Sequence, residues 1–138
     1  MDDRVVLPYW VLRIGLGLGA LTAGLDKFFD KLADWEMYLS PLATKVIPVS
    51  GHTFMRAVGV IEIIVGLAIL AGVTRLGGYV LMLWLVGIAI NLVSSGSFYD
   101  LAVRDIEICL GAFTLARLSV LRETSPASNT ANLRAKTA

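Results

Sequence analysis

Four long apolar stretches, separated by shorter polar segments, fill most of this chain. They run from about residue 7 to 25, 55 to 74, 76 to 95 and 101 to 120. Each is close to the roughly 20 residues that a helix needs to cross the hydrocarbon core of a bilayer. No stretch alternates apolar and polar residues with a period of two, so the pattern does not favour strands. It predicts an all-helical, single-domain membrane protein with four spans.

Polar and small residues share one helix face in every apolar stretch. The faces comprise Arg13, Gly17, Ala20, Gly24 and Lys27; Gly59, Glu62 and Gly66; Trp84, Gly87, Asn91 and Ser94; and Asp105, Cys109, Ala112, Ala116 and Ser119. Small residues let a neighbouring helix approach closely, whereas a polar group facing lipid carries a high free-energy cost. We therefore predict an integral membrane four-helix bundle over residues 1–121, with its polar groups turned inward.

Glu62, Asn91 and Asp105 are predicted to lie in the same half of this bundle. A rise of about 1.5 Å per residue, counted from the side of the longest loop, places them roughly 6 to 11 Å below the surface. Arg13 starts deeper, but its long side chain can extend toward Glu62. We expect the two to pair, which would keep Glu62 ionised inside the bundle.

Lys27 and Arg104 lie at the ends of their stretches and are expected to support this cluster. Arg104 and Glu107 are three residues apart on one helix, so we predict that they pair and leave Asp105 as the titrating group. A purely structural role is the alternative, because buried ion pairs and asparagine hydrogen bonds often only fix helix register. Either role suits the pattern.

The connection between the first two apolar stretches begins with a helical pattern. Its apolar residues Phe28, Leu32, Trp35 and Leu39 recur every three or four positions, and charged residues lie opposite them. The pattern predicts a short interfacial helix over about residues 27–39. This helix would either lie flat at the membrane surface or cap the end of the bundle.

Charged and polar residues outside the spans indicate the orientation and the state of the tail. The side with both termini carries slightly more Lys and Arg than the other, which predicts cytoplasmic termini. Residues 122–138 turn to Ser, Thr, Asn and Ala, and we expect a disordered tail there. The first stretch is too long for a signal peptide and contains Arg13, so we interpret it as a span.

Composition narrows the classes of function. Hydrophobic residues make up 57% of the chain and charged residues 17%, as in a membrane protein. A net charge of +1 without a basic, aromatic-rich stripe argues against a nucleic-acid partner. The single histidine, His52, lies in a loop, and no residue spacing suggests a metal or haem site. The single cysteine, Cys109, excludes dithiol chemistry by one chain alone.

Several segments, in order, resemble the DoxX family of small bacterial membrane proteins. Residues 12–17 (LRIGLG) and 23–28 (AGLDKF) are similar to the opening of that family, which has an arginine, glycines and a G-x-x-K-F pattern. Residues 59–62 (GVIE) and 71–75 (AGVTR) resemble its central hairpin, and Arg104 with Asp105 resembles the R-D that opens its last span. The resemblance covers about residues 9–120.

This resemblance implies a multi-pass protein of the bacterial inner membrane that serves as a subunit of a redox assembly. Family relatives include subunits associated with thiosulfate:quinone or quinol oxidation, and others are thought to tether redox enzymes. A quinone head group would then be held by Arg13, Glu62, Asn91 or Asp105. The chain has no flavin, haem or metal pattern and no autonomous catalytic motif, so a partner chain would have to supply the electrons.

Two further functions are compatible with the residues. The chain could be a non-catalytic scaffold that recruits a partner protein through the interfacial helix or the tail. It could also be a small-solute or proton carrier that uses its carboxylates, in which case four spans would require a homo-oligomer.

Overall fold

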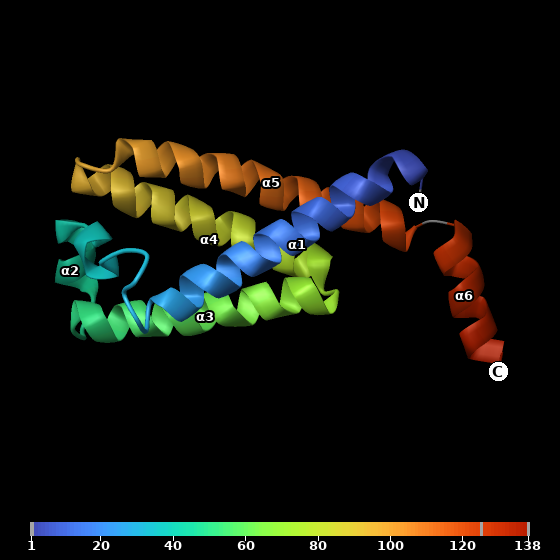
Figure 1. Ribbon diagram of the computed structural model, residues 1–138, viewed down its shortest axis with the longest axis horizontal. Coiled ribbons are helices and arrows are strands. Elements are labelled where there is room, and N and C mark those ends of the chain that lie inside the picture. The colour runs from blue at the N-terminus through green and yellow to red at the C-terminus, as the bar shows by residue number, and fades with distance from the viewer. Residues whose placement is uncertain (1, 125, 138) are drawn as a thin grey trace.

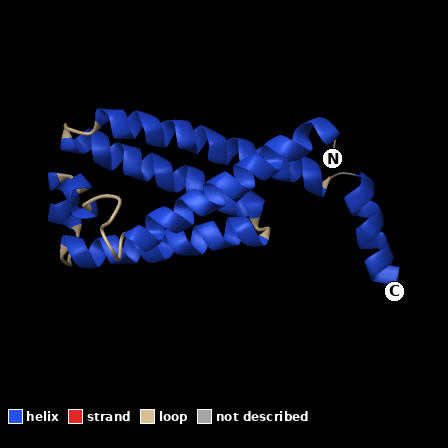
Figure 2. Ribbon diagram, viewed as in Figure 1, coloured by secondary structure: helices blue, strands red, loops and turns tan. Residues whose placement is uncertain are grey.

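The computed structural model of this chain describes residues 2–124 and 126–137, and in those residues every regular element is a helix. Figure 1 shows the arrangement of the helices, and Figure 2 shows that short loops join them. The elements are α1 (Asp3–Asp26), the 3-10 helix η1 (Trp35–Tyr38), α2 (Pro41–Val46), α3 (Gly51–Ala71), α4 (Thr74–Ser95), α5 (Tyr99–Glu123) and α6 (Pro126–Thr137).

Local capping explains where several of these helices begin and end. The side chains of Asp2, Ser40 and Ser50 accept hydrogen bonds from the backbone N–H groups at the starts of α1, α2 and α3. Gly72 ends α3 with φ 111° and Gly96 ends α4 with φ 73°, a left-handed conformation that favours glycine. Because only Gly72 and Val73 separate α3 from α4, these two helices form a hairpin.

The four long helices pack mainly as two pairs, α1 with α3 and α4 with α5. Glycines allow the two helices of each pair to approach closely. A Cβ atom built on Gly66 would lie 2.7 Å from the backbone nitrogen of Leu21 in α1, and one built on Gly78 would lie 2.9 Å from the carbonyl oxygen of Ala112 in α5. On α1, α3 and α5 the faces predicted from sequence are surfaces along which the helices touch. On α4 the prediction is wrong, because Gly87 and Ser94 are exposed and Gly77 and Gly78 are buried instead.

Both the interior and the outer surface of the helix bundle are apolar. Ile69 and Leu115 are fully buried in the core. Large apolar side chains such as Leu18, Ile64 and Leu83 are exposed on the outer faces. An apolar exterior around a packed interior suits a helix bundle in a membrane, because lipid chains and not water contact its outer faces.

Three of the helices, α1, α3 and α4, are long and apolar enough to span a membrane. They correspond to the first three spans expected from the sequence. α5 forms where the fourth span was expected, but it is not among these apolar helices, and it carries Arg104, Asp105, Glu107 and Arg117 within its length. The four-span bundle thus stays a prediction, whereas an all-helical protein with three apolar, span-length helices is shown.

The helix predicted over residues 27–39 is wrong. The chain turns after α1, Asp30 adopts φ 49°, and only the four residues of η1 are helical before α2 begins. The physical cause is Asp26, whose carboxylate accepts the backbone N–H groups of Lys31 and Leu32. These bonds fold the segment back onto the end of α1, so its apolar residues do not form one continuous face.

Disorder of the tail stays a prediction. Residues 126–137 form α6, which extends away from the other helices in Figure 1. It begins with Pro126, a residue suited to the first turn of a helix, and carries Arg134 and Lys136 in its last turn, where basic side chains favour the helix dipole.

Candidate functional site

A buried ion pair joins α1 to α3 near the end of the molecule that carries α2. Lys27 Nζ lies 2.6 Å from Glu62 Oε2, and the two side chains are only 5% and 8% exposed. Lys27 is the residue that follows α1, and Glu62 lies in the middle of α3 between Gly59 and Gly66. A charge at this depth is costly unless it is paired, and each residue supplies the counter-charge of the other.

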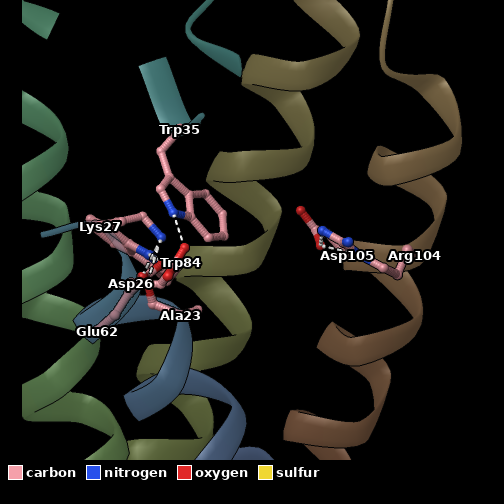
Figure 3. A network of polar contacts seen from close by, with 8 residues as sticks. All are labelled: Ala23, Asp26, Lys27, Trp35, Glu62, Trp84, Arg104 and Asp105. Atoms are coloured by element: carbon pink, nitrogen blue, oxygen red, sulfur yellow. Dashed lines mark hydrogen bonds and ion pairs between the residues drawn. The ribbon is translucent and has the colours of Figure 1, made fainter. Parts of the chain in front are cut away.

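Two tryptophans complete the surroundings of this pair (Figure 3). Trp84 of α4 donates its indole N–H to Glu62 Oε1 at 3.4 Å. The ring of Trp35 in η1 lies over Lys27, with Nζ 3.8 Å from the ring centroid, a distance typical of a cation–π interaction. Lys27 also donates to the carbonyl oxygen of Ala23 at 3.5 Å. The pair is therefore enclosed by side chains from α1, α3, α4 and η1.

Asp26 holds Trp35 in this position. Its Oδ2 atom accepts the indole N–H of Trp35 at 2.9 Å and the backbone N–H of Leu32 at 2.9 Å, while Oδ1 accepts the backbone N–H of Lys31 at 3.1 Å. The sequence reasoning missed Asp26, and it assigned Trp35 only to an apolar helix face. A signal was available, because Asp26 is an acidic residue at the end of an apolar stretch and directly precedes Lys27.

Asp105 forms a second buried group on α5. It pairs with its neighbour Arg104, whose Nη2 lies 3.1 Å from Asp105 Oδ1, and not with a residue one turn away. The predicted pairing of Arg104 with Glu107 is thus not the one that the structure records. The Asp105 side chain is 6% exposed and that of Arg104 57%, so the arginine covers the carboxylate from outside. In Figure 3 no drawn contact links this pair to Lys27 and Glu62.

Arg13 lies far from Glu62, which corrects the predicted pairing of these two residues. Its Nε and Nη2 atoms donate to the carbonyl oxygens of Ile69 and Leu70 at 3.1 and 2.7 Å. Those carbonyls belong to the last turn of α3, the negative end of the helix dipole, which attracts a cation. Lys27 lies 14 residues further along α1, roughly 20 Å away along the axis, and takes the place expected for Arg13.

Asn91 fastens the loop to α4. Its side-chain nitrogen donates to the carbonyl oxygen of Tyr38 at 2.7 Å, and its side-chain oxygen accepts the backbone N–H of Ser40 at 3.0 Å. Both ends of the amide are engaged by backbone groups on either side of Leu39. Of the four residues expected to converge, Arg13, Glu62, Asn91 and Asp105, each is held by a different set of partners.

The remaining reactive side chains add no metal centre among the described residues, where no group of three or more His, Cys, Asp or Glu side chains is close enough to hold an ion. His52 is exposed near the start of α3. Cys109 is buried and directs its thiol toward the carbonyl oxygen of Met82 at 3.5 Å.

Comparison with known proteins agrees with the resemblance seen in the sequence. The model of the DoxX family matches residues 9–94, which include Arg13, Lys27, Glu62 and Asn91. Arg104 and Asp105 lie beyond the matched residues. No curated protein and no solved structure shows a significant match. The match covers more than half of the chain and includes all three apolar span-length helices, and the chain is therefore a membrane protein that belongs to the DoxX family.

Proposed function

We propose that this chain is a four-span subunit of a quinone-linked redox assembly in the bacterial inner membrane. The ion pair of Lys27 and Glu62 beneath Trp35 would be the centre of its head-group site. The observation that carries the proposal is this buried pair, flanked by two indoles, inside a small bundle of apolar helices. Ligand sites of this kind combine apolar walls with a few polar groups that fix orientation.

The donors around Glu62 suit a ligand with carbonyl oxygens. Two contacts of the cluster are long, that from Lys27 Nζ to the Ala23 carbonyl at 3.5 Å and that from the Trp84 indole to Glu62 at 3.4 Å. Hydrogen bonds of this length contribute little, so a carbonyl acceptor could take over either donor at small cost. Trp35 and Trp84 would pack against a flat ring.

A quinone bound here would supply two-electron chemistry, and this chain would supply binding and orientation. Lys27 would hold a carbonyl oxygen by a charge-assisted hydrogen bond, and Trp84 would orient the ring through its N–H. Glu62 would hold the Lys27 side chain in position through the ion pair. The electrons would come from a partner chain, because no redox motif is recognisable in the sequence.

We further propose that α5 crosses the membrane as the fourth span, with both termini cytoplasmic. α5 has 25 residues, roughly 37 Å at 1.5 Å per residue, which exceeds the thickness of the hydrocarbon core. It packs closely along α4, a span-length apolar helix. Asp105 is covered by Arg104, and Asp100, Arg122 and Glu123 lie at the ends of α5, where they can reach the interfaces.

Quinone binding can be tested with the purified protein in mild detergent. A water-soluble short-chain quinone should quench tryptophan fluorescence in a saturable way. Trp84→Phe keeps an aromatic side chain but removes the N–H donor, and it should weaken binding about ten-fold. Lys31→Met, which changes an exposed lysine on the nearby loop, is the matched control and should bind like the wild type. Non-saturable quenching, or equal affinity in Trp84→Phe, would count against the site.

An exposed apolar surface favours a second function, that of a scaffold for a partner protein. The segment between α1 and α3 exposes Phe29, Leu32, Leu42 and Val46, each by more than 60%. Apolar patches of this kind mark surfaces that meet a membrane or another protein. Co-purification from native membranes tests this role: charged substitutions at Leu42 and Val46 should release the partner while the fold is kept.

A further inference from the structure

A cleft of about 470 Å³ lies at the opposite end of the molecule from Lys27 and Glu62. It is bordered by the N-terminal half of α1, the hairpin between α3 and α4, the last turns of α5, and α6. These segments lie in the half of the molecule that holds the N-terminus in Figure 1. The residues of this cleft that matter here are Tyr9, Arg13, Thr74, Ser119, Arg122 and Glu123. Neither the family match nor the proposed quinone site assigns it a role.

The floor of the cleft is a chain of buried hydroxyl groups. Ser119 donates to Thr74 Oγ1 at 2.7 Å, and a second hydrogen bond of 3.2 Å joins Thr74 Oγ1 to the Tyr9 hydroxyl. Tyr9, Thr74 and Ser119 are 2%, 4% and 2% exposed. Three hydroxyl groups from α1, α4 and α5 thus meet where apolar side chains would otherwise pack. Hydroxyl hydrogens rotate, so such a floor can donate toward an incoming anion.

Two guanidinium groups border this floor, and both lie near the ring of Trp10. Arg13 Cζ lies 4.7 Å from the ring centroid of Trp10, and Arg122 Cζ lies 5.5 Å from the same ring and 5.1 Å from that of Tyr9. Two of the five N–H donors of Arg13 bond to α3 carbonyls, which leaves donors for a ligand. Glu123 also borders the cleft, and it pairs with Arg75 at 3.3 Å.

Both guanidinium groups line one cleft, so an anion bound there would be attracted to each of them. Guanidinium groups match the geometry of phosphate oxygens and bind them through paired hydrogen bonds. Trp10 is 40% exposed between the exposed apolar residues Leu7 and Val11, as expected of a tryptophan at a membrane interface. Basic pockets between helices at that level are suited to lipid head groups.

We propose that this cleft binds the phosphate group of an anionic phospholipid, with the acyl chains lying along the exposed apolar face of α1 at Leu7 and Val11. Arg122 and Arg13 would hold the phosphate oxygens, and the hydroxyl floor would donate to the same group from below. Free inorganic phosphate offers the same chemistry without the acyl chains. The proposal does not depend on quinone binding at the other end of the bundle.

Native mass spectrometry of the full chain after exchange into detergent tests this proposal. Phosphatidylglycerol, phosphatidylcholine and inorganic phosphate are added separately, and the bound fraction is measured. Arg122→Gln is the main variant because Arg122 is exposed and its loss leaves the core intact. Arg117→Gln, an exposed arginine of the same helix outside the cleft, is the matched control. Thermal unfolding of each variant verifies that the fold is kept.

We expect phosphatidylglycerol to bind more tightly than phosphatidylcholine, and Arg122→Gln to weaken that binding about ten-fold while Arg117→Gln does not. Arg122→Lys should recover part of the loss, since it restores the charge without the planar group. If inorganic phosphate binds saturably but displaces no lipid, the ligand of the cleft is a soluble anion and the lipid proposal is wrong. Equal lipid binding in Arg122→Gln and the wild type would overturn the proposal.

Discussion

Gly24 on α1 and Gly59 on α3 face each other so closely that a Cβ atom built on either would lie 2.7 Å from the carbonyl oxygen of the other. Lys27 and Glu62 come one turn later on their respective helices, so the glycine contact sets the separation across which the ion pair forms. Close helix packing and the buried charges are consequently linked in this protein.

Gly59→Ala should therefore destabilise the protein by about 1 to 3 kcal/mol, because the added methyl group meets backbone that cannot move aside. Gly15→Ala is the matched control, since a Cβ there has nothing within 4 Å and alanine favours the helix. Thermal unfolding in detergent measures both. Similar unfolding temperatures for the two variants would contradict the glycine contact.

The Lys27–Glu62 pair should be costly to break from one side only. Lys27→Met and Glu62→Leu each leave one buried charge without its partner, and each should reduce the free energy of unfolding by about 3 to 5 kcal/mol. The double variant removes both charges and should recover most of that loss. A double-mutant cycle from denaturation in detergent gives the coupling energy, and additive losses would show that the two side chains do not interact.

Asn91→Leu should release the loop from α4. The change removes the hydrogen bonds to the Tyr38 carbonyl and the Ser40 N–H, at a cost of about 1 to 3 kcal/mol for the backbone groups left unpaired. Amide hydrogen exchange should become faster over residues 35–46, with little change in α5. Ser94→Ala, which loses only a bond within its own helix, is the control. If amide hydrogen exchange over residues 35–46 is the same in Asn91→Leu as in the wild type, Asn91 does not hold this segment against α4.

Crossing of the membrane by α5 predicts that its two ends are labelled from opposite sides. In a Cys109→Ser background, a cysteine replacing Asp100 should react with a membrane-impermeant maleimide added outside the inner membrane. A cysteine replacing Glu123 should react only after the membrane is opened, because the termini are expected in the cytoplasm. Labelling of both positions from the same side would exclude a fourth span.

The sequence predicted the helices well because apolar length and small-residue spacing are local properties of the chain. Positions such as Gly59 and Gly66 indicated which face of α3 would be buried, and the structure agrees. The partner of Glu62 was not predictable in this way. Both Arg13 and Lys27 lie on the same face of α1, and only the relative shift of α1 against α3 decides which of them reaches Glu62.

The loop was mispredicted for a related reason. A helical period over residues 27–39 competes with the hydrogen bonds that Asp26 offers to Lys31, Leu32 and Trp35. Side-chain acceptors of this kind often divert the backbone from a helix. Tertiary packing decides whether the backbone N–H groups bond to the side chain or within a helix. Trp35 reaches Lys27 only because the chain folds back. Apolar periodicity alone carries no sign of that reversal.

The division of the bundle into two tightly packed pairs has a mechanical consequence. α1 and α3 interlock through glycines, α4 and α5 do the same, and the boundary between the two pairs has fewer contacts. Trp84 reaches Glu62 across that boundary. If the α1–α3 pair separated from the α4–α5 pair, Glu62 would become accessible from the lipid. The glycine contacts within each pair would be kept.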